Sequence, residues 1–299
     1  MCKKYFLKKV RKMEQLLNKL KLYWSLIKAP QTGLLLVTGI TGYISSQCPV
    51  MNWQSFLGLV ASLFLAISGS TILNMVYDQD IDSKMNRTKN RPLPTGSLKR
   101  NEAFFVGLSF SFFGVAIATY MSVLFGIIVF IGLFIDLIIY TVWLKRKSAW
   151  SIIWGGISGG MPILAGRVLG IGEIDFIGIL FSLAILLWIP THILTFSIRY
   201  FEDYAKAGIP TFPSTYGNKK TQLIIAISSL IATLTIVLVA FSLGLSWGHV
   251  RLLSVLAVGV VGLAIVSVFK PSEQVNFGLF KYASIYMLGS MVMVTLGTL

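Results

Sequence analysis

Long apolar stretches constrain this chain more than any other feature of its sequence. A helix needs about 20 consecutive, mostly apolar residues to cross the hydrocarbon core of a bilayer. Stretches of about this length occur at 29–47, 53–77, 103–120, 121–144, 149–170, 175–199, 221–245, 249–269 and 281–298. Alternation with a period of two, which is typical of membrane β-barrels, is absent from the sequence. The sequence therefore predicts an all-α, polytopic membrane protein with nine transmembrane helices.

The composition excludes the main alternatives to a membrane protein. Only 12% of the 299 residues are charged and 55% are hydrophobic, whereas an average soluble domain has about 25% charged residues. Such a chain is neither soluble nor disordered, and its two cysteines are too few for a disulfide framework. The net charge of +15 would indicate a nucleic-acid partner in a soluble protein. Here the basic residues lie between apolar stretches, so we predict a lipid bilayer and no nucleic acid as partner.

The distribution of basic residues predicts the orientation in the membrane. If the N-terminus is inside and nine spans alternate, 24 of the 26 lysines and arginines lie on the inner side. Only Arg167 and Arg251 lie on or near the outer side. Cytoplasmic loops of membrane proteins carry such an excess of basic residues. We therefore expect a multi-pass protein of the cell (cytoplasmic) membrane, N-in and C-out, with the motifs described below facing the cytoplasm.

The first 28 residues differ from the rest of the chain. Their basic region is too long for a signal peptide, and no small-residue cleavage site follows a short apolar core. Apolar residues recur at spacings of three and four, at Val10, Met13, Leu17, Leu20, Trp24 and Ile27. This pattern predicts an amphipathic helix lying on the cytoplasmic leaflet, with a partly disordered basic tail as the alternative. We therefore divide the chain into a basic amphipathic segment, 1–28, and a nine-helix domain, 29–299.

An acidic cluster follows the second apolar stretch. On a helix, Asn74, Asp78 and Asp82 are spaced by four residues and share one face, whereas Asp80 points elsewhere. Like charges at this spacing repel each other, and desolvation at a membrane boundary adds to the cost. A hard cation offsets that cost. Few oxygen ligands suit Mg²⁺ that also holds substrate phosphates.

A basic loop follows the acidic face at once. Arg87, Lys89 and Arg91 alternate along a segment that ends at Pro92. Such a cluster pairs well with a diphosphate, and arginine pairs with it bidentately. A purely topogenic role explains these basic residues, but it leaves the three oxygen-donor side chains at helical spacing unexplained. The combination is typical of a metal–diphosphate site.

A second cluster follows the sixth apolar stretch and resembles the first. Glu202 and Asp203 stand near a helix end, and Lys206 and Pro210 follow in a loop. Spans two and six therefore look like equivalent members of two four-helix halves, as in other membrane folds with internal repeats. The alternative is a plain charged loop.

Other charged residues are candidates for function. Span four ends in the basic residues Lys145, Arg146 and Lys147. Lys145 either reaches the same phosphates or serves only to orient the protein in the membrane. Within the apolar stretches lie Asp136, Arg167 and His192. Ionisable groups inside a bilayer are functional candidates by default. For Asp136 and His192, hydrogen bonding to neighbouring helices is the structural alternative, and the sequence leaves the roles of Asp136 and Arg167 open.

These motifs resemble the UbiA superfamily of intramembrane prenyltransferases over roughly residues 25–299. The most specific part is Asn74, Asp78 and Asp82 together with the loop from Arg87 to Pro92. The segments most similar to the branch that farnesylates protoheme IX are 82–93, 140–146, 188–192 and 203–210. Two segments, 190–193 and 210–213, depart from that branch, and the second acidic motif is reduced to Glu202 and Asp203.

The resemblance implies a fold, a reaction and a set of site residues. The fold is nine helices, in two four-helix-like halves, around a central cavity that opens to lipid. The reaction is Mg²⁺-dependent transfer of a farnesyl or other prenyl group from its diphosphate to a vinyl group of protoheme IX, followed by addition of water. The implied metal ligands are Asn74, Asp78, Asp82 and Asp203, of which the three aspartates are catalytic. The implied diphosphate ligands are Arg87, Lys89, Arg91 and Lys145.

Further residues are expected to act on the acceptor and on the allylic cation. His192 is the candidate for contacting haem, and Tyr77, Tyr140 and Trp143 are candidates for stabilising the cation through their ring faces. Two other functions remain open. One is prenylation of a quinone precursor or another aromatic or lipid acceptor. The other is secondary transport of an anionic solute, although a transporter would carry its charges near mid-span.

Overall fold

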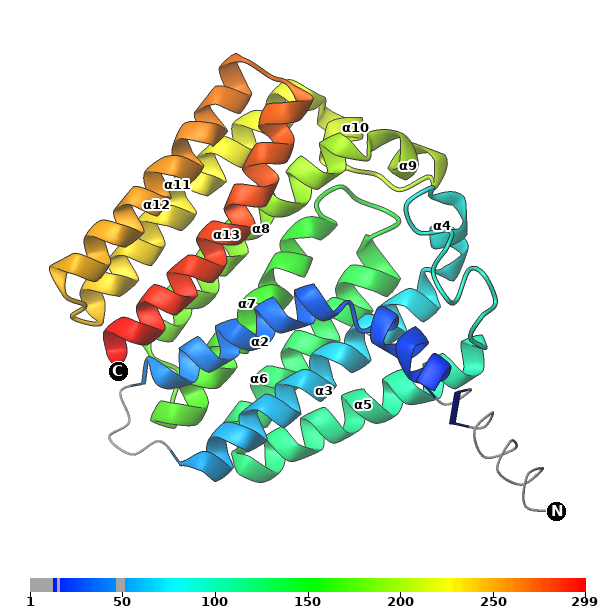
Figure 1. Cartoon of the computed structure of the whole chain (residues 1–299), viewed down its shortest axis with the longest axis horizontal. Helices are drawn as coiled ribbons and strands as arrows, with labels where there is room; N and C mark the ends of the chain where they lie inside the picture. The colour runs from blue at the N-terminus through cyan, green and yellow to red at the C-terminus, as the bar shows by residue number, and fades with distance from the viewer. Residues whose placement is uncertain (1–12, 15–16, 47–51) are drawn as a thin grey trace.

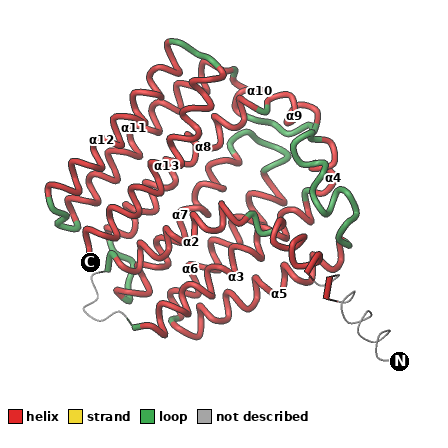
Figure 2. Tube along the Cα trace, viewed as in Figure 1, coloured by secondary structure: helices red, strands yellow, loops and turns green. Residues whose placement is uncertain are grey.

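The protein is described here by a computed structural model over residues 13–14, 17–46 and 52–299. Within these ranges every regular element is helical and no strand occurs (Figure 2). The helices are α2 (Ala29–Ile44), α3 (Trp53–Tyr77), α4 (Gln79–Lys84), α5 (Arg100–Met121), α6 (Val123–Phe134), η1 (Ile135–Leu144), α7 (Ser151–Ile171), α8 (Phe176–Arg199), α9 (Phe201–Lys206), α10 (Phe212–Tyr216), α11 (Asn218–Ser242), α12 (Trp247–Phe269) and α13 (Glu273–Thr298). The prediction of an all-α fold is confirmed.

Among the described residues, eight helices are long and apolar enough to cross a membrane. α6 and η1 together form one of them, Val123–Leu144. The stretch expected to span at 29–47 is present as α2, but this helix has only 16 residues and is about 24 Å long from its rise per residue. The bounds of the other eight agree with the predicted stretches to within a few residues, except that α13 begins at Glu273 rather than at 281.

The long helices stand side by side (Figure 1). Successive long helices pack against each other along most of the chain, and α13 returns to contact both α8 and α2. α2 also packs on α3 and α7, which ties the beginning of the bundle to its middle. The short helices α4, α9 and α10 lie together at one end of the bundle, with the loops that connect them (Figures 1 and 2).

The surface of the bundle has the polarity expected in lipid. Large apolar side chains face outward, for example Phe112 at 66% exposure and Val258 at 72%. Hydroxyl side chains such as Thr41, Ser62 and Thr191 are instead fully buried between helices. Outside a bilayer such an arrangement would leave large apolar areas in water. It agrees with a multi-pass membrane protein whose helices are joined by small and hydroxyl side chains.

Glycines allow the close approach of α2 and α7. A Cβ atom on Gly166 of α7 would collide with the carbonyl oxygen of Gly39 on α2, and one on Gly42 would collide with that of Ile163. The glycine-rich character of the fifth stretch therefore has the packing role that small residues have in other membrane helices. This contact positions α2 along one wall of the cavity described below.

The N-terminal segment has a helix at residues 17–26, and residues 1–12 and 15–16 lie outside the described part. Leu22, Tyr23 and Leu26 pack with residues of α3 and α5, and Lys19 pairs with Glu102 of α5 at 2.9 Å. The predicted apolar stripe instead remains exposed at Met13, Leu17, Leu20 and Trp24. Ile27 is buried, and Val10 lies outside the described residues, so Ile27 is the one buried member of the described part of that stripe. The helix therefore contacts the bundle through a face that the sequence pattern did not indicate.

Three local departures from regular α-helix concern the site. The last ten residues of the fourth span form a π-helix, η1, in which the amide of Lys145 donates to the carbonyl of Tyr140. α3 ends at Tyr77, and Asp78 separates it from the short helix α4. α8 ends in the same way, with Tyr200 between it and the six-residue helix α9. This common ending supports the predicted equivalence of the second and sixth spans.

Candidate active site

Asp78 and Asp82 lie at the end of α3 and in α4, and both carboxyl groups are buried. The predicted helix is interrupted at Asp78, but the backbone keeps its spacing because Asp78 N donates to Asn74 O and Asp82 N donates to Asp78 O, at 2.9 and 2.8 Å. Asp80 is more than half exposed and pairs with Arg146 through two hydrogen bonds of 2.8 Å. The structure therefore separates Asp80 from its neighbours as the helical spacing predicted.

Each of the two buried carboxylates has a basic partner from another part of the chain. Lys145, just after η1, donates to Asp78 Oδ2, and Arg91 donates to Asp82 Oδ2 at 2.8 Å. Burial opposes the charged form of Lys145, but Tyr140 and the Asp78 carboxylate together raise the pKa of the ammonium above its ordinary value. The second oxygen of Asp78, Oδ1, is buried and accepts no hydrogen bond from the described residues. Arg146 NH2 lies 4.0 Å from this oxygen, beyond hydrogen-bond distance. A buried carboxylate oxygen without a hydrogen bond is costly, and it fits a metal ligand.

The predicted metal ligands are not all gathered at one point. Among the described residues, no three His, Cys, Asp or Glu side chains come close enough to form a metal-binding group. Asp203 lies in α9, and its two oxygens accept from the amides of Asn86 and Arg87, each at 3.2 Å. It therefore holds the basic loop in place, while its role as a metal ligand stays a prediction. Asn74, Asp78 and Asp82 fit Mg²⁺, which takes one or two carboxylates and completes its shell with water and phosphate.

The basic loop turns two of its three predicted cations toward the site. Arg87 and Arg91 line a cavity with Asp78, Asp82 and Lys145. The guanidinium of Arg87 also stacks over the ring of Phe196 at 4.8 Å, which fixes its position. Lys89 is exposed and donates to Asn86 Oδ1 at 3.0 Å, away from the residues that line the cavity. A phosphate contact by Lys89 remains a prediction that the geometry does not favour.

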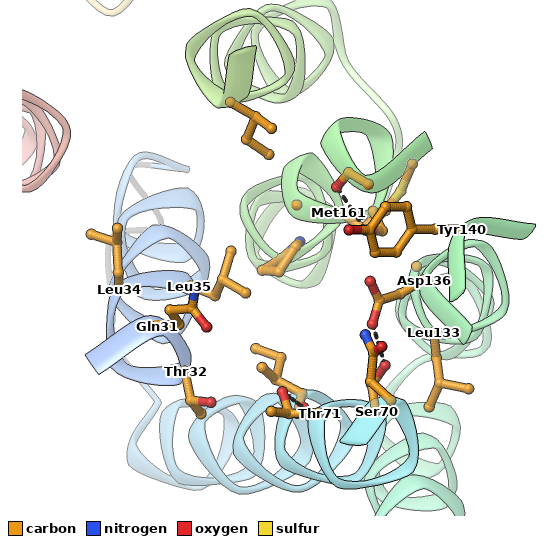
Figure 3. Close-up of a pocket in the computed structure, with 18 of the residues that line it drawn as sticks. Gln31, Thr32, Leu34, Leu35, Ser70, Thr71, Leu133, Asp136, Tyr140 and Met161 are labelled. Atoms are coloured by element: carbon orange, nitrogen blue, oxygen red, sulfur yellow. Dashed lines mark hydrogen bonds between the residues drawn. The ribbon is translucent and has the colours of Figure 1, made fainter. Parts of the chain in front are cut away.

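Two cavities adjoin at this end of the bundle. The outer one, of about 500 Å³, is lined by the charged residues just described and by the loop that leads into α10. The inner one, of about 310 Å³, lies between α2, α3, η1 and α7, as Figure 3 shows. Its upper part carries Asn74, Asp136 and Tyr140, and its deeper part is apolar, with Leu63, Val129 and Ala165 in its wall. Such a space suits a molecule with a charged head and an apolar tail.

Lys28, Tyr140, Lys145 and His192 line both cavities and mark their junction. Lys28 was not predicted as a site residue. It lies between the N-terminal helix and α2, and it is the only non-glycine residue with a positive φ among the described residues, at 47°. Burial and the nearby charges of Arg91 and Lys145 lower the pKa of its ammonium to about 8. A left-handed lysine at a helix junction has no sequence signal, because lysine rarely adopts that conformation.

His192 lies in α8, with its ring stacked between two aromatic rings. The centroids of Trp188 and Phe280 are 4.9 and 4.5 Å from that of His192, and Nδ1 is 3.2 Å from the hydroxyl of Ser284. The structure thus places His192 in the cavity wall, but it does not test contact with an acceptor. Of the three aromatic residues expected near an allylic cation, only Tyr140 lines the cavities. Trp143 is 55% exposed, and Tyr77 contacts Arg146 and the carbonyl of Val142 instead.

Comparisons with known proteins agree with this geometry. The model of the UbiA prenyltransferase family matches residues 35–285. A protoheme IX farnesyltransferase of Pyrobaculum islandicum is 33% identical over 263 residues, which cover 88% of this chain and 94% of that protein. The structure is also similar to that of a digeranylgeranylglyceryl phosphate synthase, with a TM-score of 0.78 and 21% identity over 94% of this chain and 99% of that one. A UbiA homologue of Archaeoglobus fulgidus bound to DMAPP and Mg²⁺ has a TM-score of 0.68 and 15% identity, over 91% and 98% of the two chains.

Proposed function

Because the chain belongs to the UbiA prenyltransferase family, we propose that it transfers a farnesyl group from farnesyl diphosphate to a vinyl group of protoheme IX. The enzyme class follows from the family. The farnesyl donor and the haem acceptor are taken from relatives named protoheme IX farnesyltransferase, one of which matches 88% of the chain. The observation that carries the proposal is the pair of adjoining cavities, one lined by paired carboxylates and cations and the other apolar at depth.

The two buried ion pairs suggest how the chain binds the diphosphate. Asp78 and Asp82 are paired with Lys145 and Arg91 in the structure. Asn74, Asp78 and Asp82 would hold Mg²⁺, which would supply Lewis-acid stabilisation of the leaving diphosphate, as is consistent with the Mg²⁺ and DMAPP bound to the A. fulgidus homologue. Lys145 and Arg91 then turn from the carboxylates to phosphate oxygens, with Arg87 beside them. The cations therefore stabilise the charge that develops when the allylic C–O bond breaks.

The apolar depth of the inner cavity receives the isoprenoid tail. Its wall there is made by side chains of α3, α6 and α7, so water is excluded around the chain. Tyr140 lines both cavities, and Lys145 Nζ lies 5.6 Å from its ring centroid. We assign Tyr140 to stabilisation of the allylic cation, and His192 to the acceptor at the junction of the two cavities.

The proposed location is the cell membrane with the active site facing the cytoplasm. The charged loops, α4, α9 and α10 share one end of the bundle (Figure 1), and 24 of 26 basic residues belong to segments predicted at that end. The positive-inside rule assigns this end to the cytoplasm.

A reconstituted reaction tests the proposal. The purified protein is incubated with farnesyl diphosphate, haem and MgCl₂, and the haem is extracted and weighed by mass spectrometry. We expect a haem product heavier by one farnesyl group and one hydroxyl group, and none when EDTA replaces Mg²⁺. A product formed only with an added quinone precursor would assign a different acceptor. Absence of any pyrophosphate release, with uptake of an anion into proteoliposomes, would favour a transporter.

A further inference from the structure

Asp136 is a buried acid that the proposed diphosphate site does not use. It lies near the start of the π-helix η1, inside the membrane, and faces the inner cavity (Figure 3). Its Oδ2 accepts a hydrogen bond of 2.5 Å from Ser70 Oγ of α3. Among the described residues, no group donates a hydrogen bond to its Oδ1. Burying a carboxylate inside a membrane span is energetically costly, so such a residue is a candidate for a function.

The π-helical backbone keeps Asp136 in this position. The hydroxyl of Thr141 donates to the carbonyl of Asp136 at 2.7 Å, across the wider turn. π-helical turns are rare and often occur at functional sites. Together with the bond from Ser70, this fixes the backbone and one oxygen of Asp136 and leaves the other oxygen toward the cavity. The upper part of the cavity also carries Asn74 and the Tyr140 ring, so several polar groups surround the same space.

The level of Asp136 in the cavity can be placed relative to the diphosphate site. Ser70, Asn74 and Asp78 follow one another at four-residue intervals along the end of α3. Ser70 is therefore about 12 Å below Asp78 along the helix, from its rise per residue. A diphosphate bound at the proposed site, beside Asp78, would lie above Asn74, so on the proposed function the bond that breaks lies near Asn74, one turn above the Ser70–Asp136 pair.

We propose that Asp136 and Ser70 hold the water molecule that completes the reaction, and that Asp136 accepts its proton. The inference rests on the proposed transfer to protoheme. The terminal carbon of the vinyl group forms a bond with farnesyl C1, whose C–O bond electrons leave with diphosphate. The positive charge is then on the vinyl carbon attached to the porphyrin. The water oxygen forms a bond to that carbon, and one water proton passes to the Asp136 carboxylate, which leaves a neutral alcohol.

The cavity meets the physical requirements of a bound water. A water molecule in a protein interior needs space and two to four polar partners. Asp136 Oδ1 accepts one of its hydrogen bonds, and the Ser70 hydroxyl is held beside it. The apolar side chains deeper in the cavity keep other water away from the allylic cation. The single water held by Asp136 therefore reacts after the carbon–carbon bond has formed, when the positive charge is on the vinyl carbon and that carbon lies beside the water.

The ratio of two haem products tests this role. A cation that does not gain water loses a proton from the neighbouring CH₂ group to diphosphate and gives an alkene, lighter by one water molecule. We expect Asp136→Asn, which keeps the shape but cannot accept the proton, to raise the alkene-to-alcohol ratio at least tenfold in mass spectra. Ser70→Ala should raise the ratio by a smaller factor. The Kd of farnesyl diphosphate should stay within twofold in both, which also shows that the proteins are folded.

Ser68→Ala is the matched control. Ser68 is two residues from Ser70 on α3, and its buried hydroxyl has no hydrogen-bond partner among the described residues, so the product ratio should not change. An unchanged ratio in Asp136→Asn would overturn the inference while leaving the proposed function intact. Loss of both products with normal diphosphate binding would place Asp136 before hydration and would also overturn it. If the wild-type protein forms no haem product, the proposed function fails, and the inference fails with it.

Discussion

Buried ion pairs occur at both ends of α7, and they differ in how completely they are satisfied. Arg167, near the end of α7, donates from Nε and NH2 to Asp175 at 2.7–2.9 Å and from NH1 to Ser45 at 2.7 and 3.0 Å. At the opposite end, Lys145 and Arg91 pair with Asp78 and Asp82, but Asp78 Oδ1 has no hydrogen-bond partner in the described part of the chain. Only the second group lines a cavity among those described here.

This comparison separates structural from functional charge. Both groups take charges out of water, which is expensive in each case. The Arg167 group recovers the cost through its own hydrogen bonds, and the arginine holds the end of α2 to the loop before α8. In the Asp78 group one carboxylate oxygen accepts no hydrogen bond, so a ligand that interacts with this oxygen gains binding energy. A charged residue in a membrane span is therefore a functional candidate only after its partners have been counted.

The largest expected effect on stability is that of Arg167→Ala. Removing one partner of a buried pair leaves the Ser45 carbonyl without its donor and Asp175 with only the hydrogen bond from Gly178 N, and such losses cost about 3–5 kcal/mol. We expect a markedly lower Tm in detergent, measured by thermal unfolding, whereas turnover per folded molecule should change less than about twofold. Arg251→Ala is the control, since Arg251 is exposed and its loss should cost less than about 0.5 kcal/mol. A stable Arg167→Ala protein without activity would contradict the comparison.

The largest expected effect on catalysis is that of Asp78→Asn. The change removes a negative charge at the proposed metal while keeping the size of the side chain. Loss of one electrostatic contact to a transition state costs about 100–1000-fold in turnover, and we expect this loss in pyrophosphate release at saturating Mg²⁺. The Tm should fall less than that of Arg167→Ala, because the asparagine oxygen can still accept a hydrogen bond from Lys145. Asp80→Asn is the matched control, because Asp80 is exposed and paired with Arg146. Equal activity of both variants would remove Asp78 from the metal site.

The sequence predicted these two groups unequally well. The spans were predictable because about 20 apolar residues have few ways to be buried other than in lipid. The spacing of Asn74, Asp78 and Asp82 survived the break in the helix because the hydrogen bonds to the preceding turn persist. Arg167 was a functional candidate in the sequence because nothing there showed its partner. Asp175 is eight residues away, and only the folded structure brings the two side chains together.

Other features depend on contacts between distant segments and had no local signal. The hydrogen bond from Ser70 to Asp136 joins residues 66 positions apart. The anchoring of the basic loop by Asp203 spans 117 positions. The apolar stripe of the N-terminal helix was predicted to face the leaflet, which stays a prediction, whereas the helix packs on the bundle through Leu22, Leu26 and Ile27. Hydrophobic periodicity predicts which face of a helix packs on the protein only when lipid does not offer a second apolar environment.

A smaller effect is expected when Arg91 is replaced by lysine. Lysine keeps the charge but loses the planar group that contacts a carboxylate or phosphate through several N–H donors. We expect KM for farnesyl diphosphate to rise about tenfold, corresponding to about 1.4 kcal/mol, with a smaller change in kcat. Lys99→Arg makes the reverse exchange at an exposed position of the same loop and should leave KM unchanged. Similar KM values for the two variants would indicate that Arg91 serves only to orient the protein in the membrane.

The smallest effect concerns the pH dependence of binding through Lys28. Burial and the charges of Arg91 and Lys145 lower the pKa of its ammonium to about 8, so in the free protein the charge is lost as the pH rises through that value. A bound diphosphate favours the charged form and raises the pKa, so binding takes up a proton and weakens as the pH rises from 7 to 9. Titration of a non-hydrolysable prenyl diphosphate should show a several-fold rise in Kd over this range. Lys28→Arg keeps its charge and should give a flat profile, whereas Lys28→Met should bind weakly at every pH. A wild-type profile as flat as that of Lys28→Arg would show that Lys28 does not contact the diphosphate.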